Sequence, residues 1–215
     1  MTSVSVTKFS VALSVILLFS SFVLPGGLAA EVVGPRAVTA EAAKRLTDRL
    51  TNEKAAIETS PELVKQFVEQ ELLPIFDARL MSKLVMSASW KKATEAQQVA
   101  FVHAFRNVLI KTYSNAFSSY DGQELEFKDP IFNKDKTKSI VRSRILQKEK
   151  MPILVDYRLR KTAQGWLVYD AVIEGVGVVK SYRSQIKEKI DEKGIALMIE
   201  DMEVEACGDK GCGTS

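Results

Sequence analysis

The period with which apolar side chains recur changes part-way along this chain, and that change is the strongest constraint on its fold. In residues 41–120 the apolar positions follow the 3.6-residue period of α-helices, whereas in residues 124–174 they follow the two-residue period of β-strands. Helical spacing returns after residue 178. Helices, then consecutive strands, then helices again is the order expected of an α+β domain with one antiparallel sheet.

Local signals mark where the helices of the first half begin and end. Ser60 and Pro61 stand in the cap-then-proline order that favours a helix start, and Pro74 interrupts the helix that follows. Thr94 and Gln97 form a capping box that opens a long helix to about residue 120. The same periodicity predicts further helices over residues 41–57, 77–89, 178–191 and 195–203.

The central part of the chain predicts a sheet of about four strands. In one strand Val155, Tyr157 and Leu159 alternate with charged residues, so one face should be buried and the other wet. The last strand is apolar on both faces, which suits a central strand or one that lines an interior space. The four strands are predicted over residues 124–128, 139–147, 152–161 and 166–174.

The first 29 residues are predicted to be an export signal. Lys8 supplies the only charge before Glu31, residues 9–23 are mostly apolar, and small residues precede the expected cleavage after Ala29 or Ala30. The alternative is an uncleaved anchor helix, but the apolar core is shorter than the roughly 20 residues that span a bilayer. We therefore expect a single domain over residues 31–205 outside the cytoplasm.

The two cysteines lie close together near the end of the chain. Cys207 and Cys212 are predicted to form a short disulfide in a flexible tail over residues 206–215, because exported proteins meet oxidising conditions; free thiols are the alternative. Two cysteines and the distant His103 do not make a closed zinc site, so we expect no metal and no cofactor. The chain has 30 Lys and Arg residues against 27 Asp and Glu, and this balance argues against a nucleic-acid partner.

No catalytic motif stands out in the sequence. A nucleophile elbow, a phosphate-binding glycine loop and a His-Glu-x-x-His pair are all missing from it. An enzyme would need His103 and Asp170 to meet in one cleft. A carboxylate in an apolar strand needs hydrogen-bond partners, so a structural bond from Asp170 to a backbone or basic group is favoured over a catalytic acid. We expect a protein that is not an enzyme.

Four segments carry a resemblance to a known family: residues 69–74 (EQELLP), 89–98 (SWKKATEAQQ), 101–105 (FVHAF) and 168–179 (VYDAVIEGVGVV). In this order and spacing the chain resembles the MlaC, or toluene-tolerance auxiliary, family from about residue 39 to about residue 202. The resemblance implies helices packed around a strongly curved antiparallel sheet, similar to the NTF2-like and cystatin-like folds, with a lipid pocket between sheet and helices.

The resemblance also implies a function. It implies a monomeric periplasmic phospholipid carrier that exchanges lipid between an outer-membrane lipoprotein complex and an inner-membrane ABC transporter complex of Mla type. Such a carrier maintains the lipid asymmetry of the outer membrane. The alternative is an NTF2-like periplasmic module that binds a small hydrophobic molecule or a peptide.

A carrier must enclose the acyl chains of its lipid. Two chains of roughly 15 CH₂ groups, at about 0.8 kcal/mol each, would cost on the order of 20 kcal/mol to expose to water. Composition does not distinguish the lining of such a pocket from a packed core. Strand and helix phase predict these lipid-binding residues: Leu84, Val85, Phe105, Leu109, Tyr113, Ile145, Val155, Tyr157, Val168, Val172, Ile173, Val176 and Val179.

Overall fold

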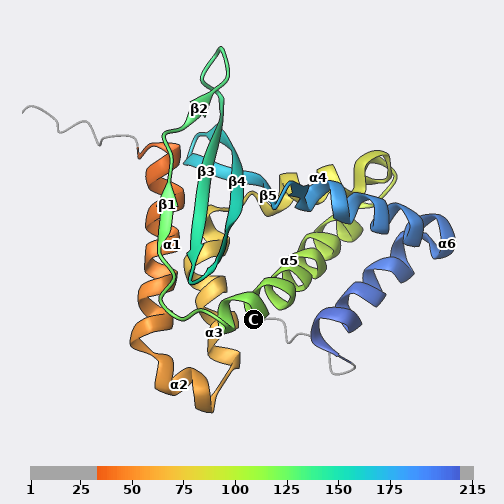
Figure 1. Cartoon of the computed structure of the whole chain (residues 1–215). Coiled ribbons are helices and arrows are strands. Elements are labelled where there is room, and N and C mark those ends of the chain that lie inside the picture. Colours follow the sequence, from red (N-terminus) through yellow and green to blue (C-terminus); the bar gives the residue numbers. More distant parts are fainter. Residues whose placement is uncertain (1–32, 209–215) are drawn as a thin grey trace, which may run out of the picture. The chain divides into compact units, whose positions relative to one another are not determined.

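The computed structural model describes residues 33–208, which form helices and one antiparallel sheet (Figure 1). The α+β class predicted from the change of period is confirmed. The helical elements are α1 (Pro35–Asn52), α2 (Lys54–Thr59), α3 (Glu62–Phe67), the π-helix η1 (Val68–Leu72), the 3₁₀-helices η2 (Leu73–Ile75) and η3 (Ser87–Lys91), α4 (Ala78–Met86), α5 (Glu95–Ser118) and α6 (Val178–Cys207).

The capping box predicted for the long helix is present, whereas Ser60 does not cap α3, whose start has no side-chain cap hydrogen bond. Thr94 and Gln97 form the capping box of α5, with both reciprocal hydrogen bonds present. The helix predicted over residues 41–57 differs, because α1 begins earlier at Pro35 and the chain leaves helical geometry at Glu53 before α2. The two predicted C-terminal helices are the two arms of α6, divided at Gly194, whose φ of 81° suits glycine.

The sheet is open and has six strands rather than the four predicted. Its order is β1-β3-β4-β5-β6, and β2 pairs with β3. The two additional strands are two residues long, which is too short for an alternating pattern to reveal. The strands are β1 (Leu125–Phe127), β2 (Ile131–Phe132), β3 (Lys138–Gln147), β4 (Lys150–Thr162), β5 (Gly165–Ile173) and β6 (Val176–Gly177).

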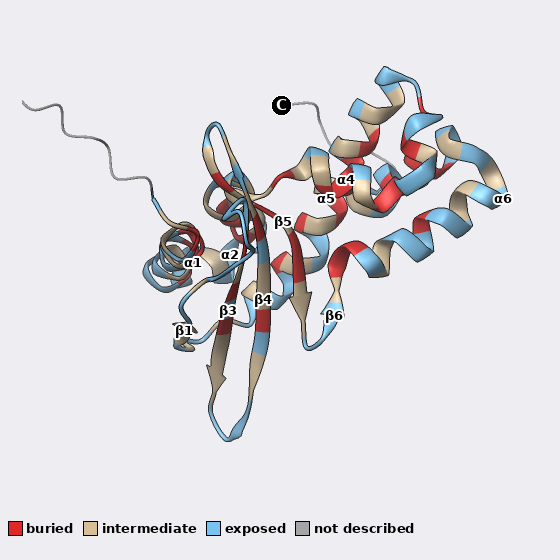
Figure 2. Cartoon of the chain, turned by 90° about the horizontal axis from the view of Figure 1, so that it is seen from above, coloured by how far each residue is buried: buried red, intermediate tan, exposed pale blue. Residues whose placement is uncertain are grey.

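The inner face of the sheet is filled at one end only. There Val141, Leu159 and Val168 are fully buried and pack against η2 and α1. Towards the other end of β3 and β4, Ile145 and Ile153 are only half-buried, although they pair across the two strands. Buried positions in the strands are accordingly confined to one part of their length (Figure 2). The helices therefore pack closely against one end of the sheet and leave space at its other end.

Asp77 ties the helices to the sheet at this packed end. Its carboxylate accepts a hydrogen bond from the Leu80 N–H at 2.9 Å, which caps α4, and another from Arg160 Nε of β4 at 2.6 Å. Its own N–H donates to the carbonyl of Val168 in β5 at 2.7 Å. These bonds hold the η2–α4 junction against β4 and β5, and Phe76 and Ala78, the neighbours of Asp77, line the space beyond.

Candidate functional site

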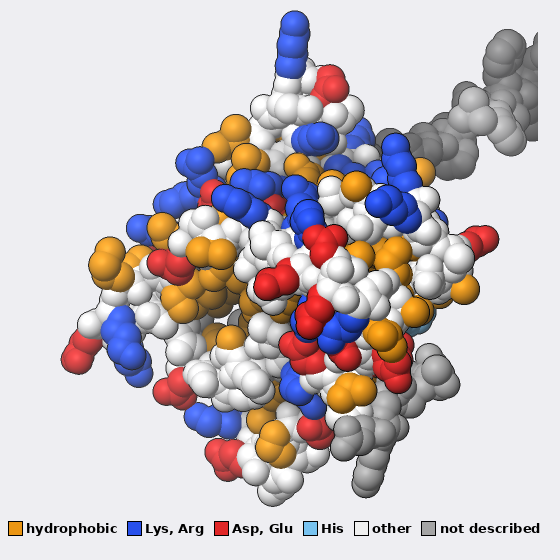
Figure 3. Space-filling view, turned by 90° about the vertical axis from the view of Figure 1, so that its right-hand side faces the viewer, with side chains coloured by type: hydrophobic (Ala, Val, Ile, Leu, Met, Phe, Trp, Pro, Cys, Tyr) orange, Lys and Arg blue, Asp and Glu red, His pale blue; other side chains and the backbone are white. Residues whose placement is uncertain are grey.

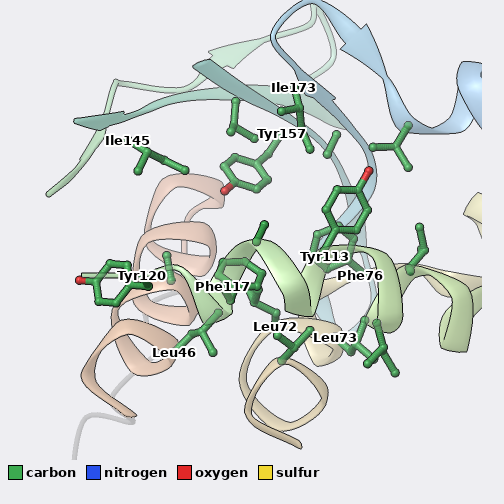
Figure 4. Close-up of a pocket in the computed structure, with 18 of the residues that line it drawn as sticks. Leu46, Leu72, Leu73, Phe76, Tyr113, Phe117, Tyr120, Ile145, Tyr157 and Ile173 are labelled. Atoms are coloured by element: carbon green, nitrogen blue, oxygen red, sulfur yellow. The ribbon is translucent and has the colours of Figure 1, made fainter. Parts of the chain in front are cut away.

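A cavity of about 420 Å³ lies between the unfilled end of the sheet and the helices. Figure 4 shows Ile145, Tyr157 and Ile173 projecting into it from the sheet, opposite Tyr113 and Phe117 of α5. The remaining labelled walls come from α1, η1, η2 and the residues that follow η2 and α5, namely Leu46, Leu72, Leu73, Phe76 and Tyr120.

The cavity walls are almost wholly apolar or aromatic. The polar side chains that reach the lining besides tyrosines are few, and one of them, Arg106, is neutralised by Glu69 of η1 at 2.6 Å. Three others, Ser119, Gln123 and Gln147, cluster where α5 ends and β3 approaches its hairpin, and Ser119 is exposed. We call this end the mouth. The space-filling view also shows a hollow with largely hydrophobic walls (Figure 3).

Two tyrosines place hydroxyl groups in this apolar setting without adding charge. Burial, together with smaller electrostatic contributions from Tyr182 and Asp170, raises the pKa of Tyr113 to about 12. Burial likewise raises the pKa of Tyr157, against a smaller lowering by its hydrogen bond with Ser143. Both phenols are therefore neutral in any physiological compartment, and the cavity suits an uncharged, apolar guest.

Seven of the thirteen lipid-binding residues predicted from the sequence line this cavity. They lie on two surfaces: the middle of α5 and the inner face of strands β3, β4 and β5. They are Phe105, Leu109, Tyr113, Ile145, Val155, Tyr157 and Ile173.

The structure places the other six outside the cavity walls. Val85 and Val179 are buried where α4, α5 and α6 pack together, and Leu84 packs against the same cluster. Val168 is fully buried in the filled end of the sheet. The other two face away: Val172 pairs with Asp156 and Gly177 on the face of β5 opposite Ile173, and Val176 is 61% exposed at β6.

Several lining residues were not predicted as such. Leu46, Leu72 and Phe117 do lie on the predicted apolar faces of their helices. Their periodicity signalled that they face inwards, but an inward face looks the same in sequence whether it meets a neighbour or a cavity. Phe76 and Tyr120 lie just beyond helix ends, where periodicity gives no signal.

Asp170 has a structural environment that fits the interpretation favoured from the sequence. Its carboxylate is nearly fully buried and accepts hydrogen bonds from Arg158 at 2.9 Å and from the Val179 N–H at 3.0 Å, at the start of α6. His103 is exposed on α5. The carboxylate thus joins β4, β5 and α6, and its oxygens are engaged by groups other than His103.

Some predictions concern parts of the chain that the structure does not describe. The signal peptide and its cleavage site lie outside the described residues, as does Cys212. Cys207 ends α6 and is disulfide-bonded, while its pairing with Cys212 stays a prediction. Within residues 33–208, no helix is both long enough and apolar enough to cross a membrane.

A family model described as "MlaC protein" matches residues 40–204. The chain belongs to the MlaC family. Among curated relatives of this MlaC-family chain is the intermembrane phospholipid transport system binding protein MlaC of Haemophilus influenzae, 23% identical over 80% of the chain and 82% of that protein. Another is the toluene tolerance protein ttg2D of Pseudomonas putida, 24% identical over 74% of each protein.

A solved structure shares the fold of this MlaC-family chain. It is the phospholipid-binding protein from Ralstonia solanacearum in complex with a phospholipid, with a TM-score of 0.73 and 25% sequence identity. The match covers 79% of this chain and 94% of the Ralstonia protein. The family and the fold expected from the sequence resemblance are therefore confirmed.

Proposed function

We propose that this protein is a periplasmic phospholipid carrier of the Mla pathway. The observation that carries the proposal is the apolar cavity of about 420 Å³ between sheet and helices in a chain of the MlaC family. The relatives' names support it, since one is a phospholipid transport system binding protein and a structural neighbour holds a phospholipid. The chemistry of the walls fits acyl chains, which offer no hydrogen-bonding group to pair.

The arrangement separates the acyl chains, which must be kept from water, from the headgroup, which must be hydrated or hydrogen-bonded. Acyl chains gain about 0.8 kcal/mol for each CH₂ removed from water, so apolar walls on all sides supply the free energy of binding. A headgroup needs water or polar partners, and Ser119, Gln123 and Gln147 supply such groups at the mouth. The lipid-binding residues of the proposal are accordingly the seven predicted residues in the cavity together with Leu46, Leu72, Phe76 and Phe117.

The proposal extends to the partners. We infer that the carrier, as a monomer, exchanges lipid between an outer-membrane lipoprotein complex and an inner-membrane ABC transporter complex, because one relative is named as part of an intermembrane transport system. We propose no catalytic step, since Asp170 is engaged in structural hydrogen bonds and His103 is exposed.

Lipid analysis of the protein as purified from cells tests the proposal. We expect organic extraction and mass spectrometry to recover diacyl phospholipid in near-stoichiometric amount, because an empty apolar cavity would stay in unfavourable contact with water. Full occupancy by a small non-lipid metabolite would contradict it and favour a small-molecule binding module.

A further inference from the structure

A second hollow, of about 440 Å³, adjoins the mouth of the cavity. Two segments form it: residues 121–124 between α5 and β1, and residues 146–150 at the β3–β4 hairpin. Gln123 and Gln147 line both this hollow and the cavity, so the two spaces are neighbours. We call the second hollow the mouth pocket.

The backbone holds the two walls of the mouth pocket together. The Leu146 N–H donates a hydrogen bond to the carbonyl of Glu124 at 2.8 Å. The hairpin turns tightly at Glu149, which has a φ of 55°, and the loop turns at Gly122 with a φ of 77°. This hydrogen bond joins the two walls directly, while their charged side chains are exposed to solvent.

The two walls carry opposite charges. Lys148 and Lys150 stand on the hairpin wall, and Asp121 and Glu124 on the loop wall. Asp121 pairs with Lys54 of α2 at 3.0 Å, whereas no ion pair within residues 33–208 engages Lys148, Lys150 or Glu124. Glu124 on one wall, and Lys148 and Lys150 on the other, are therefore the charged groups outside ion pairs.

The charges of the two walls act on one another across the pocket. The pKa of Asp121 is lowered, chiefly by its hydrogen bond and attraction to Lys54 and then by attraction to Lys148. Asp121 is therefore ionised, and Lys148 of the hairpin wall attracts it across the pocket. A guest that carries both a negative and a positive group would meet a complementary partner for each.

We propose that the mouth pocket holds the headgroup of a zwitterionic aminophospholipid, with its phosphate at Lys148 and Lys150 and its ammonium group at Glu124. This inference rests on the proposed lipid-carrier function and names the lipid class. The phosphate is esterified to the glycerol that joins the tails, so it is the headgroup charge nearest to the cavity, and Gln147 of the hairpin wall lines both the cavity and the mouth pocket. The ammonium group lies two carbons beyond the phosphate ester and can reach the acidic wall. A phosphatidylglycerol headgroup has no cation for that wall.

Competition between two lipids with the same tails tests the inference. Purified protein is incubated with an excess of mixed vesicles of dioleoyl phosphatidylethanolamine and dioleoyl phosphatidylglycerol, and the bound lipids are quantified by native mass spectrometry. Both lipids share one membrane, so the rate of encounter is the same for each. Because exposed ion pairs contribute little individually, we expect a preference for the ethanolamine lipid of about three- to ten-fold over its share in the vesicles.

Charge variants assign that preference to the pocket. Glu124→Lys should abolish or reverse the preference, and the double variant Lys148→Ser/Lys150→Ser should lower retention of both lipids. Glu188→Lys makes the same charge change on an exposed part of α6 outside both hollows, and it should keep the wild-type preference.

Two results would overturn the inference while leaving the carrier function intact. One is full occupancy of the protein with the two lipids bound in the same ratio as in the vesicles. The other is an equal change of preference in Glu124→Lys and Glu188→Lys. Failure to take up either lipid would instead overturn the carrier function and the headgroup site together. The total amount of bound lipid therefore distinguishes a failure of the headgroup site from a failure of the carrier function.

Discussion

At the scale of single residues, burial decides what each polar group does. Asp170 and Asp156 both face arginines across β-strand pairs, yet their surroundings differ. Asp170 is 7% exposed at its side chain and lies 2.9 Å from Arg158, whereas Asp156 is 37% exposed and lies 3.6 Å from Arg142. A buried carboxylate that also caps α6 stabilises the fold far more than an exposed partner in an ion pair.

Replacing Asp170 should therefore cost much more stability than replacing Asp156. We expect Asp170→Ala to lower the free energy of unfolding by about 2–4 kcal/mol, because it leaves the Val179 N–H and Arg158 without their acceptor. Asp156→Ala, the matched control, should cost at most about 1 kcal/mol. Urea denaturation of both variants measures the difference, and equal costs would contradict a structural role for Asp170.

Tyr113 should make the stability of the protein depend on pH in the alkaline range. Its pKa rises from 10.0 to about 12 on folding, so the folded state holds the phenolic proton more tightly. The resulting stabilisation is present below pH 10 and is lost as the pH rises towards 12. Since the side chain is only partly buried, we discount the effect to about 1–2 kcal/mol.

The variant Tyr113→Phe isolates this effect. Its free energy of unfolding should fall less between pH 10 and pH 12 than that of the wild type, by about 1–2 kcal/mol. Denaturant titrations at the two pH values provide the measurement. Identical slopes in both proteins would show that Tyr113 titrates normally in the folded state.

At the scale of secondary structure elements, neighbouring residues of β5 have different roles: one lines the cavity and the next lies on the opposite face of the sheet. Neighbouring residues of a strand point to opposite faces of the sheet. Ile173 lines the cavity, and Val172 pairs with Asp156 and Gly177 on the other face. A carboxylate at these two positions should therefore have different consequences for the lipid.

Charge substitution at the two positions tests this assignment. Ile173→Glu should fold and purify with much less phospholipid, because a carboxylate is unfavourable beside acyl chains, whereas this half-buried position lets water hydrate it when the lipid is absent. Val172→Glu carries the same charge on the opposite face and should retain its lipid. Extracted lipid per protein and the melting temperature are measured for both. If only Val172→Glu lost its lipid, the cavity would lie on the Val172 face of β5, and our assignment of the two faces would be wrong.

At the scale of the whole molecule, the lipid-binding domain and the C-terminal tail should behave independently. Among the described residues, the buried hydrophobic side chains lie within residues 42–202, before Cys207. A disulfide between Cys207 and Cys212 would close only a very short loop. Such a loop restricts few conformations of the unfolded chain, so it adds little to the stability of the core.

We accordingly predict that Cys207→Ser combined with Cys212→Ser leaves lipid occupancy unchanged and shifts the melting temperature by no more than about 3 °C. Calorimetry and lipid extraction of the double variant provide the measurements. A drop of many degrees would show that the tail contributes to the fold. Reduction of the wild-type protein with dithiothreitol should reproduce the behaviour of the variant.

The sequence by itself determined the order of the longer elements, the fold class and the inward face of most of them, but not that of β5, which is apolar on both faces. These properties depend on local signals: the capping box at Thr94, the break at Pro74, and the alternation around Tyr157. Each signal acts between residues a few positions apart, and so it can be seen without the tertiary structure. The family resemblance added the expectation of a cavity and of its lipid.

Only the tertiary structure decided which inward-facing residues meet a neighbour and which meet empty space. Val168 and Ile173 both lie on β5, yet the η2 segment and α1 cover the first, and the curved end of the sheet leaves the second uncovered. Local periodicity carries no information about the distance to the opposing element. That distance depends on long-range contacts such as those of Asp77 with β4 and β5, which form only when segments far apart in the sequence come together.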